Sequence, residues 1–257
     1  MPGLVDAHAH LQHAAFDADL PAVLDRARAA GLVRILVPGY DRASSERALE
    51  LAAAHPDLLD AAVGIHPHHA GTATPADWVA VEALAADPRA LAVGEIGLDF
   101  FRNLSDPDVQ RDGFARQLDL AARVGKPVIV HDRDAHAELT DALLAWAPRH
   151  PRAHPGVLHC FSGDEAMAAR LAGVGFLVSF ALPVTFSSNL GPRRAAAALP
   201  ADRILVETDS PWLGLDPSGR NEPTTTLRVA AAIARLRDES AEVVAARAGE
   251  SYARLVS

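Results

Sequence analysis

The stretch from residue 90 to residue 131 reads ALAVGEIGLDFFRNLSDPDVQRDGFARQLDLAARVGKPVIVH and contains one complete unit of strand, helix and strand. Its two ends, 90–96 and 127–131, are short apolar runs that favour buried β-strands. Between them, the Ser-Asp-Pro run at 105–107 combines a capping side chain with an acid and a proline in the first helical turn, and Gly125 stands where a helix should stop. The pattern predicts a long helix between two strands.

The same alternation extends over the rest of the chain in both directions. Eight such units with mostly apolar strands predict a parallel sheet covered by helices on its outer face, and a count of eight favours closure into a barrel. We therefore predict an α/β fold, a single (β/α)8 TIM barrel over residues 1–257 with an extra C-terminal helix, and keep an open doubly wound sheet as the alternative. The predicted strands are 3–8, 33–38, 60–66, 90–96, 127–131, 156–160, 176–180 and 203–208, and the predicted helices lie near 19–30, 43–54, 75–86, 106–124, 135–147, 164–173, 189–198, 224–237 and 239–254.

Composition limits the classes of function. The first ten residues, MPGLVDAHAH, lack the basic and apolar segments of a secretory signal, and no apolar run approaches the roughly 18 residues of a membrane span. We therefore expect a cytoplasmic protein without a membrane partner. The one cysteine, Cys160, excludes an internal disulfide framework and is expected to serve packing. A net charge of −9 argues against a long basic surface for duplex nucleic acid, but it leaves room for a compact site that takes one phosphate.

Histidines and carboxylates stand at the ends of most predicted strands. In a barrel of this kind the active site lies at the carboxyl-terminal ends of the strands. Alternate residues of a strand point to the same face, so Asp6, His8 and His10 share one side of the first strand. The two imidazoles can therefore bind the same ligand. The residues found at strand ends are His8, His10, His66, Glu95, His131, His159, Glu207 and Asp209.

These side chains form a ligand set of nitrogen and oxygen atoms that suits Zn²⁺, Mn²⁺ or Fe²⁺, with Mg²⁺ tolerated where carboxylates dominate. Their number exceeds what one tetrahedral ion needs, so we predict two divalent metal ions about 3.5–4 Å apart with a bridging carboxylate. Glu95, on a middle strand, is the best bridge because it has two oxygens. Asp209 is placed to bind an ion and to take a proton from the attacking water as general base. For either carboxylate alone, a salt bridge with an arginine is the alternative.

Seven motifs, in family order and over essentially the whole chain, resemble those of the TatD-type metal-dependent deoxyribonucleases of the amidohydrolase superfamily. Any one of them is weak, but seven together are specific. They are DAHAHL (6–11), GIHPH (64–68), GEIGLDF (94–100), PVIVHDRDA (127–135), LHCFSG (158–163), ILVETDSPWL (204–213) and RNEP (220–223).

The resemblance implies a TIM barrel that hydrolyses phosphodiester bonds with two divalent ions (Zn, Mn or Mg) and a hydroxide bridging them, often as a 3′-to-5′ exonuclease on single-stranded or damaged DNA. DNA ends or another phosphodiester would be the partner, and we expect a monomer. The resemblance also places His66 beside the substrate phosphate, with a loop role as the alternative. One ion would be held by His8, His10, Glu95 and Asp209, and the second by Glu95, His131 and His159.

Arg133 and Arg220 are candidates for binding the substrate phosphate, because each follows a motif at the catalytic rim and a guanidinium fits phosphate oxygens in a bidentate way. A surface salt bridge is the equal alternative for each. The chain departs from the family pattern in three places. The segment 212–219 is short, Phe100 stands where tyrosine commonly follows GLD, and the end SYARLVS lacks a usual asparagine. The first departure puts the choice of substrate in question.

Two other functions stay open from the sequence. The same barrel could cleave a carboxylic ester or amide, as in a lactonase-like or dihydroorotase-like enzyme or one that acts on aminoacyl-tRNA. Many such enzymes bridge two ions with a carboxylated lysine, whereas here Glu95 holds that place and the one lysine, Lys126, precedes its strand. The second alternative is a non-catalytic metal-binding barrel, which predicts saturated coordination without an exchangeable position.

Overall fold

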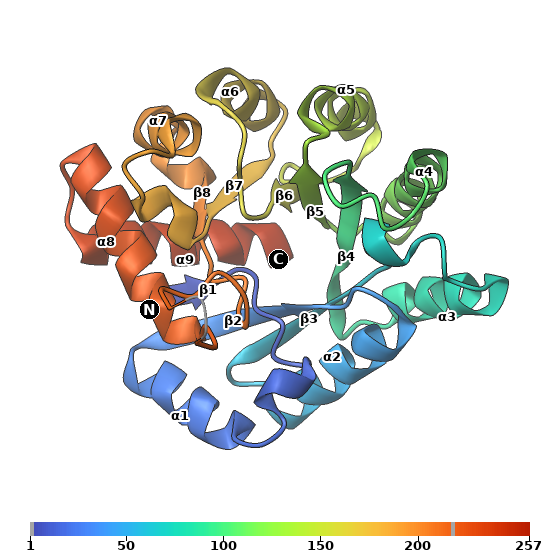
Figure 1. Cartoon of the computed structure of the whole chain (residues 1–257), viewed down its shortest axis with the longest axis horizontal. Helices are drawn as coiled ribbons and strands as arrows, with labels where there is room; N and C mark the ends of the chain where they lie inside the picture. Colours follow the sequence, from blue (N-terminus) through green and yellow to red (C-terminus); the bar gives the residue numbers. More distant parts are fainter. Residues whose placement is uncertain (1–2, 217–218) are drawn as a thin grey trace.

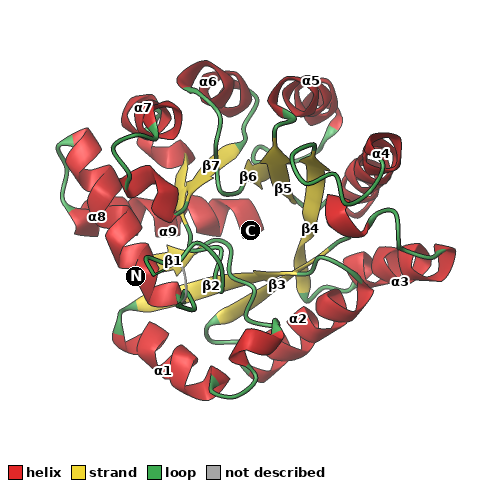
Figure 2. Ribbon diagram, in the orientation of Figure 1, coloured by secondary structure: helices red, strands yellow, loops and turns green. Residues whose placement is uncertain are grey.

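The computed structural model describes residues 3–216 and 219–257, so residues 217 and 218 of the short segment 212–219 lie outside the described part. Eight parallel strands follow one another in chain order around the sheet, and helices surround them (Figures 1 and 2). The predicted (β/α)8 architecture is confirmed. The strands are β1 (Leu4–Asp6), β2 (Leu32–Pro38), β3 (Leu59–Val63), β4 (Ala90–Asp99), β5 (Val128–Arg133), β6 (Gly156–Leu158), β7 (Leu177–Phe180) and β8 (Ile204–Val206). The helices are α1 (Leu20–Ala29), α2 (Arg42–Ala54), α3 (Pro75–Ala86), α4 (Pro107–Val124), α5 (His136–Trp146), α6 (Glu165–Gly173), α7 (Leu190–Ala198), α8 (Thr226–Arg237) and α9 (Ala241–Val256).

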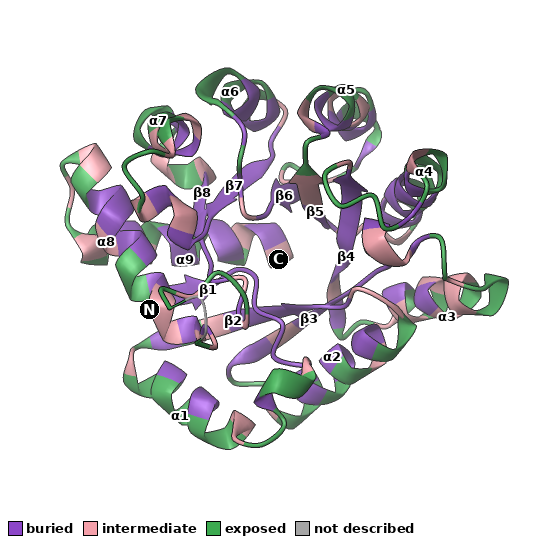
Figure 3. Cartoon of the chain, in the orientation of Figure 1, coloured by how far each residue is buried: buried purple, intermediate pink, exposed green. Residues whose placement is uncertain are grey.

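Backbone hydrogen bonds between the first and last strands close the barrel. The N–H of Ala7 donates to the carbonyl of Val206 at 3.0 Å, and the N–H of Asp209 donates to the carbonyl of His8 at 2.9 Å. The alternative of an open doubly wound sheet is therefore wrong. Burial follows the same plan, because the strands and the inward faces of the helices are buried while the outer helix faces are exposed (Figure 3).

Local signals explain where α4 begins and ends. The carboxylate of Asp106 accepts the N–H of Asp108 at 2.8 Å, and Pro107 occupies the first turn, where its missing N–H costs nothing. Gly125 ends the helix at φ 67°, a left-handed conformation that glycine adopts without strain. Among the described residues, no helix combines the length and the apolar character that crossing a membrane requires.

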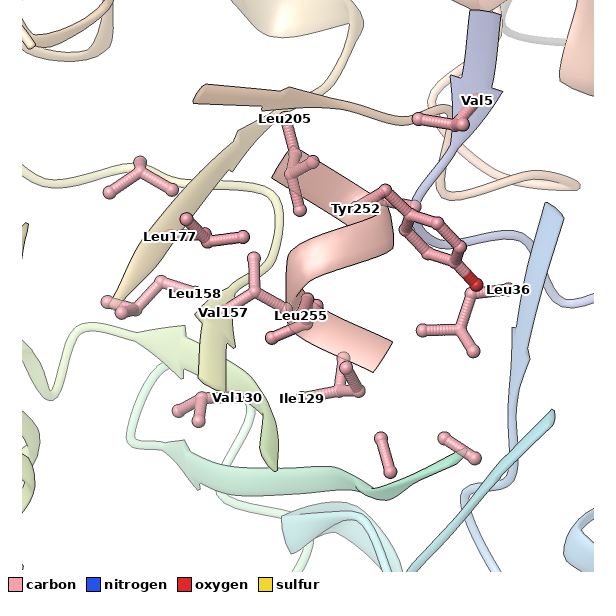
Figure 4. Packing of buried hydrophobic residues seen from close by; sticks show 14 of the residues in the cluster. Val5, Leu36, Ile129, Val130, Val157, Leu158, Leu177, Leu205, Tyr252 and Leu255 are labelled. Atoms are coloured by element: carbon pink, nitrogen blue, oxygen red, sulfur yellow. The ribbon is translucent and has the colours of Figure 1, made fainter. Parts of the chain in front are cut away.

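Helix α9 closes the amino-terminal end of the barrel. The hydroxyl of Tyr252 donates to Asp60 Oδ2 near the start of β3 at 2.8 Å, and that of Ser251 donates to the carbonyl of Asp202, just before β8, at 3.1 Å. Tyr252 lies among buried side chains of the strands (Figure 4). Because this end is plugged, the carboxyl ends of the strands form the open mouth.

Several strands differ in length from their predictions. Strands β6 and β8 stop before Cys160 and Asp209, where φ values of 43° and 54° interrupt the extended backbone. The candidate ligands His159 and Asp209 therefore lie in the turns beyond the strands. Strand β4 instead continues to Asp99, three residues past its predicted end, because Asp99 pairs with Arg133 of β5.

Candidate metal centre

The turns that carry the candidate ligands are fixed by Asp6. This buried carboxylate accepts the N–H of Thr208 at 2.9 Å and its hydroxyl at 2.6 Å, and it also accepts the N–H of His8 at 3.2 Å. Asp6 thereby ties the end of β1 to the turn after β8. Burial raises the pKa of Asp6 well above its usual range, although these hydrogen bonds oppose the rise.

Four ligand atoms converge from the segments that follow β1 and β8 and from the middle of β4. Nε2 of His8 and Nε2 of His10 lie 3.0 Å apart, and Glu95 Oε2 lies 3.3 and 3.4 Å from them. Asp209 Oδ1 lies 3.8 Å from the His8 nitrogen and 3.6 Å from that of His10. Neighbouring ligands around a tetrahedral zinc ion with bonds of about 2.0–2.1 Å lie about 3.3–3.4 Å apart. The donor atoms therefore fit a divalent cation in chemistry and in spacing.

The other oxygen of Glu95 faces a second set of nitrogens. Oε1 lies 2.8 Å from His159 Nε2, 3.0 Å from His131 Nδ1 and 3.2 Å from His66 Nε2. The His131 and His159 nitrogens are 3.2 Å apart. Each Glu95 oxygen thus has its own cluster, which is the geometry of a carboxylate that bridges two ions.

Two further carboxylates support the second cluster. Oδ2 of Asp99 lies 3.2 Å from His131 Nε2, and Oε1 of Glu207 lies 3.4 Å from His159 Nδ1. A carboxylate on the outer nitrogen orients a ligating imidazole and raises its basicity. Neither acid is predicted from the sequence to have this role. For Asp99 the available signal was its place four residues after Glu95, on the same face of an extended strand.

Burial and mutual charge set the protonation of the cluster. Burial lowers the pKa of His8 to about 4 and that of His66 to about 3, so both imidazoles are neutral near pH 7. Burial acts to raise the pKa of Glu95, but His159, His66 and His8 outweigh it and hold this pKa well below its usual range. An ionised carboxylate beside neutral imidazoles is the state in which these groups bind a metal ion.

Three other ligand candidates, His131, Asp209 and His159, have raised pKa values. Burial raises the pKa of Asp209 to about 6. Burial acts to lower the pKa of His159, but Glu95 and Glu207 outweigh it and raise this pKa well above its usual range. A bound cation would compete with the proton at each of these positions.

The cluster opens into a cleft of about 510 Å³ at the mouth of the barrel. Of the residues proposed for phosphate binding, His66 and Arg133 line this cleft. Other residues that line the cleft have no role predicted from the sequence: His13, Tyr40, His68, His69, Arg102, Trp212 and Leu213. The cleft therefore combines cationic, imidazole and aromatic side chains around the ligand cluster.

The two candidate arginines have different surroundings. Arg220 donates to both carboxylate oxygens of Asp19, at 2.6 and 2.8 Å, and to Glu222 Oε1 at 2.8 Å. It is not among the residues that line the cleft, so the salt-bridge alternative describes its position and we leave it out of the phosphate site. Arg133 stacks over the ring of Phe101 at 4.1 Å and makes no ion pair within the described part of the chain.

Lys126 lies far from the ligand cluster, whereas Cys160 lies beside it and donates its backbone N–H to Glu207 Oε1 at 2.6 Å. The ammonium group of Lys126 donates to the carbonyls of Ala85 and Asp87, at 2.7 and 2.6 Å, at the opposite end of the barrel. It therefore does not reach the place of the bridging ligand. Cys160 is not among the cleft-lining residues, and burial raises the pKa of its thiol well above the usual range.

Comparisons with known proteins agree with the motifs. The model of the family described as TatD related DNase matches residues 5–257. The uncharacterized metal-dependent hydrolase YabD of Bacillus subtilis is 37% identical over 254 residues, which cover 98% of each chain. The 3′-5′ ssDNA/RNA exonuclease TatD of Edwardsiella piscicida is 38% identical over 245 residues, 93% of each chain. The crystal structure of YJJV, a TatD homolog from Escherichia coli, superposes with a TM-score of 0.91 at 31% identity and covers 98% of this chain and 97% of its own.

Proposed function

The chain belongs to the TatD-related DNase family, and from this membership we propose that it is a divalent-metal-dependent hydrolase that cleaves phosphodiester bonds in single-stranded nucleic acid from the 3′ end. The observation that carries the proposal is the position of Glu95. Its Oε2 faces His8 and His10, and its Oε1 faces His131 and His159. We propose that two ions, of Zn, Mn or Mg, bind there, one on each side of this carboxylate.

Divalent ions held by these residues would supply Lewis-acid chemistry, lowering the pKa of water and polarising a phosphoryl oxygen. The side chains of the protein accept the proton and orient the phosphate. Asp209, whose side chain is 16% exposed, reaches the cleft and is placed to accept a proton from the attacking water. His66 and Arg133 orient the phosphate from the cleft wall. Glu95, buried and ionised, presents one oxygen to each set of histidines and so fixes the two sets relative to each other.

The proposed partner is the end of an unpaired strand rather than a duplex. The chain has a formal net charge of −9, so its surface as a whole repels polyanions, and attraction must come from the cleft itself. All proposed metal ligands belong to one chain. We therefore propose that the protein acts as a monomer.

The test is metal-dependent digestion of a single-stranded oligonucleotide by the purified protein. We expect Mn²⁺ to restore the removal of nucleotides from the 3′ end after the protein has been treated with a chelator. Glu95→Ala should abolish turnover, because it removes a ligand from both ions, and circular dichroism should show an intact fold. Retained turnover in Glu95→Ala would contradict the assignment. Faster cleavage of a lactone or of aminoacyl-tRNA than of the oligonucleotide would favour the ester-cleaving alternative.

A further inference from the structure

Two exposed aromatic residues stand on opposite sides of the mouth. Trp212, 43% exposed, follows β8, and Phe101, 59% exposed, follows β4. In a closed barrel of eight strands in chain order, β4 and β8 face each other across the axis. Trp212 lines the cleft on one side, and on the other the ring of Phe101 lies under the guanidinium of Arg133, which lines the cleft.

Trp212 lies directly against one half of the cluster. Its ring centroid is 4.8 Å from that of His10 and 5.5 Å from that of His13, and both contacts are close to perpendicular. Within residues 3–216 and 219–257, no ring stacks parallel to the indole. Leu213 and Leu215, which follow it in the chain, are exposed, and Leu213 also lines the cleft.

Phe101 presents a different surface on the opposite rim. The guanidinium of Arg133 lies over its ring at 4.1 Å, and Arg133 and Arg102 both line the cleft. The backbone N–H groups of Phe101 and Arg102 donate to Asp99 Oδ1 at 3.0 and 2.7 Å, which fixes this turn. Because Arg133 is held by stacking and has no carboxylate partner among the described residues, its N–H groups stay available to an anion.

We propose that Trp212 on one rim and the Phe101–Arg133 pair on the other bind the two nucleobases that flank the scissile phosphate, by stacking on their faces. The proposal rests on the proposed function, because it places the phosphate at the ligand cluster. One sugar separates a phosphate from each neighbouring base, so bases on both sides of a centred phosphate reach opposite rims. Stacking on aromatic side chains tolerates any base and requires the base to be unpaired. The rims thus select single strands without selecting a sequence.

The first test compares oligonucleotides with and without bases. The substrates are oligo-dT and the same strand with abasic sites at its last two 3′ positions. Stacking is worth enough that Trp212→Ala should raise KM for oligo-dT about 5- to 100-fold, with little change in kcat. KM for the abasic strand should stay as in the wild type. Trp212→Phe should keep most of the affinity, whereas Trp212→Leu, which keeps bulk without a π face, should not.

The opposite rim is tested in the same way. Phe101→Ala should also raise KM for oligo-dT but not for the abasic strand. The double variant Phe101→Ala, Trp212→Ala should bind oligo-dT more weakly than either single variant. Val79→Ala, at a 64% exposed position on α3, is the control and should leave KM unchanged for both substrates. Equal loss on the base-bearing and the abasic strand would overturn the proposal, because it would show that these side chains only shape the cleft.

Fluorescence gives a readout that does not depend on turnover. The chain has three tryptophans, so stacking on one of them should quench part of the emission when phosphorothioate oligo-dT is added to the metal-loaded protein. Trp212→Phe should lose this quenching, and the abasic strand should not produce it. Quenching that persists in Trp212→Phe would contradict the base site. If the wild type cleaves neither strand, the phosphodiesterase assignment fails, while the fluorescence result still decides whether bases bind.

Discussion

His131 presents its Nε2 atom to Oδ2 of Asp99 at 3.2 Å, so its Nδ1 atom is the one that faces the cluster. The same carboxylate oxygen lies 2.7 Å from His68 Nε2. One buried acid therefore orients two imidazoles at the wall of the cleft. Burial acts to raise the pKa of Asp99, but hydrogen bonds from His131, the backbone of Arg102 and His68 outweigh it and keep this pKa below its usual range.

Asp99→Asn should weaken binding at the His131 side of the cluster about 10- to 100-fold, the usual effect of losing a carboxylate behind a ligating histidine. Calorimetric titration of the metal-free protein with Zn²⁺ or Mn²⁺ measures this. Asp132→Asn is the matched control, because Asp132 lies on neighbouring β5 and pairs with His136 at 2.9 Å. Wild-type affinity in Asp99→Asn would show that this carboxylate has no part in metal binding.

Variants on the two sides of Glu95 should lose different ions. His10→Asn removes a nitrogen that faces Glu95 Oε2, and His159→Asn removes one that faces Oε1. We expect the wild type to bind two ions, each histidine variant to bind one, and Glu95→Ala to bind both weakly. Elemental analysis after dialysis gives the stoichiometry. Two ions retained in both histidine variants would contradict the arrangement.

Arg133 and Arg220 should behave differently towards substrate. Arg133→Ala should raise KM for oligonucleotides of any sequence and reduce the slope of log affinity against log salt by about 0.7, the effect of one lost phosphate contact on a single strand. Arg220→Ala should leave that slope unchanged, because its guanidinium is paired with Asp19 and Glu222. Binding measured between low and moderate salt separates the two, and an equal loss of slope in both variants would contradict the assignment.

Arg220→Ala should instead change the acid dependence of stability. The Arg220 hydrogen bond lowers the pKa of Asp19, and hydrogen bonds from Arg26 and then Arg220 lower that of Glu222. A lowered folded-state pKa stabilises the protein above the unfolded pKa, here about 4, and this contribution is lost as the pH falls. The difference in unfolding free energy between wild type and variant should therefore shrink from pH 7 to pH 3.5. Urea unfolding at the two values measures it, and a constant difference would exclude these carboxylates as the cause.

Tyr252→Phe should destabilise the barrel without changing turnover. Its hydroxyl donates to Asp60 Oδ2 at 2.8 Å at the closed end, and hydrogen bonds to charged groups contribute about 1.5–3 kcal/mol. Burial raises the pKa of Asp60, and the Tyr252 hydroxyl opposes the rise. A raised folded-state pKa means that stability is lost as the pH rises through it, and the variant raises this pKa further. The deficit should thus be larger at pH 7 than at pH 4 in urea unfolding, and a kcat equal to that of the wild type is the control.

The sequence by itself determined the order of elements and the polar residues of the mouth. Alternating apolar runs and capped amphipathic segments are local signals, so eight units could be counted before any contact was known. His8 and His10 could be paired because two positions along an extended chain share a face. The predicted strand 3–8 ends at Asp6, so both histidines lie beyond β1, but their Nε2 atoms do lie 3.0 Å apart. Cap and stop residues likewise located α4 to within a residue.

Only the tertiary structure decided which atoms meet. The division of the two Glu95 oxygens between separate histidine sets depends on strands that close a barrel, and no local pattern encodes side-chain orientation across that space. Arg220 pairs with Asp19, which lies 201 positions earlier in the chain. Asp99 contacts His131 because pairing with β5 extends β4 past its apolar core. The contacts by which α9 closes one end of the barrel were also decided only by the tertiary structure. Sequence patterns report what each residue prefers locally, whereas these contacts arise from long-range packing that brings distant segments together.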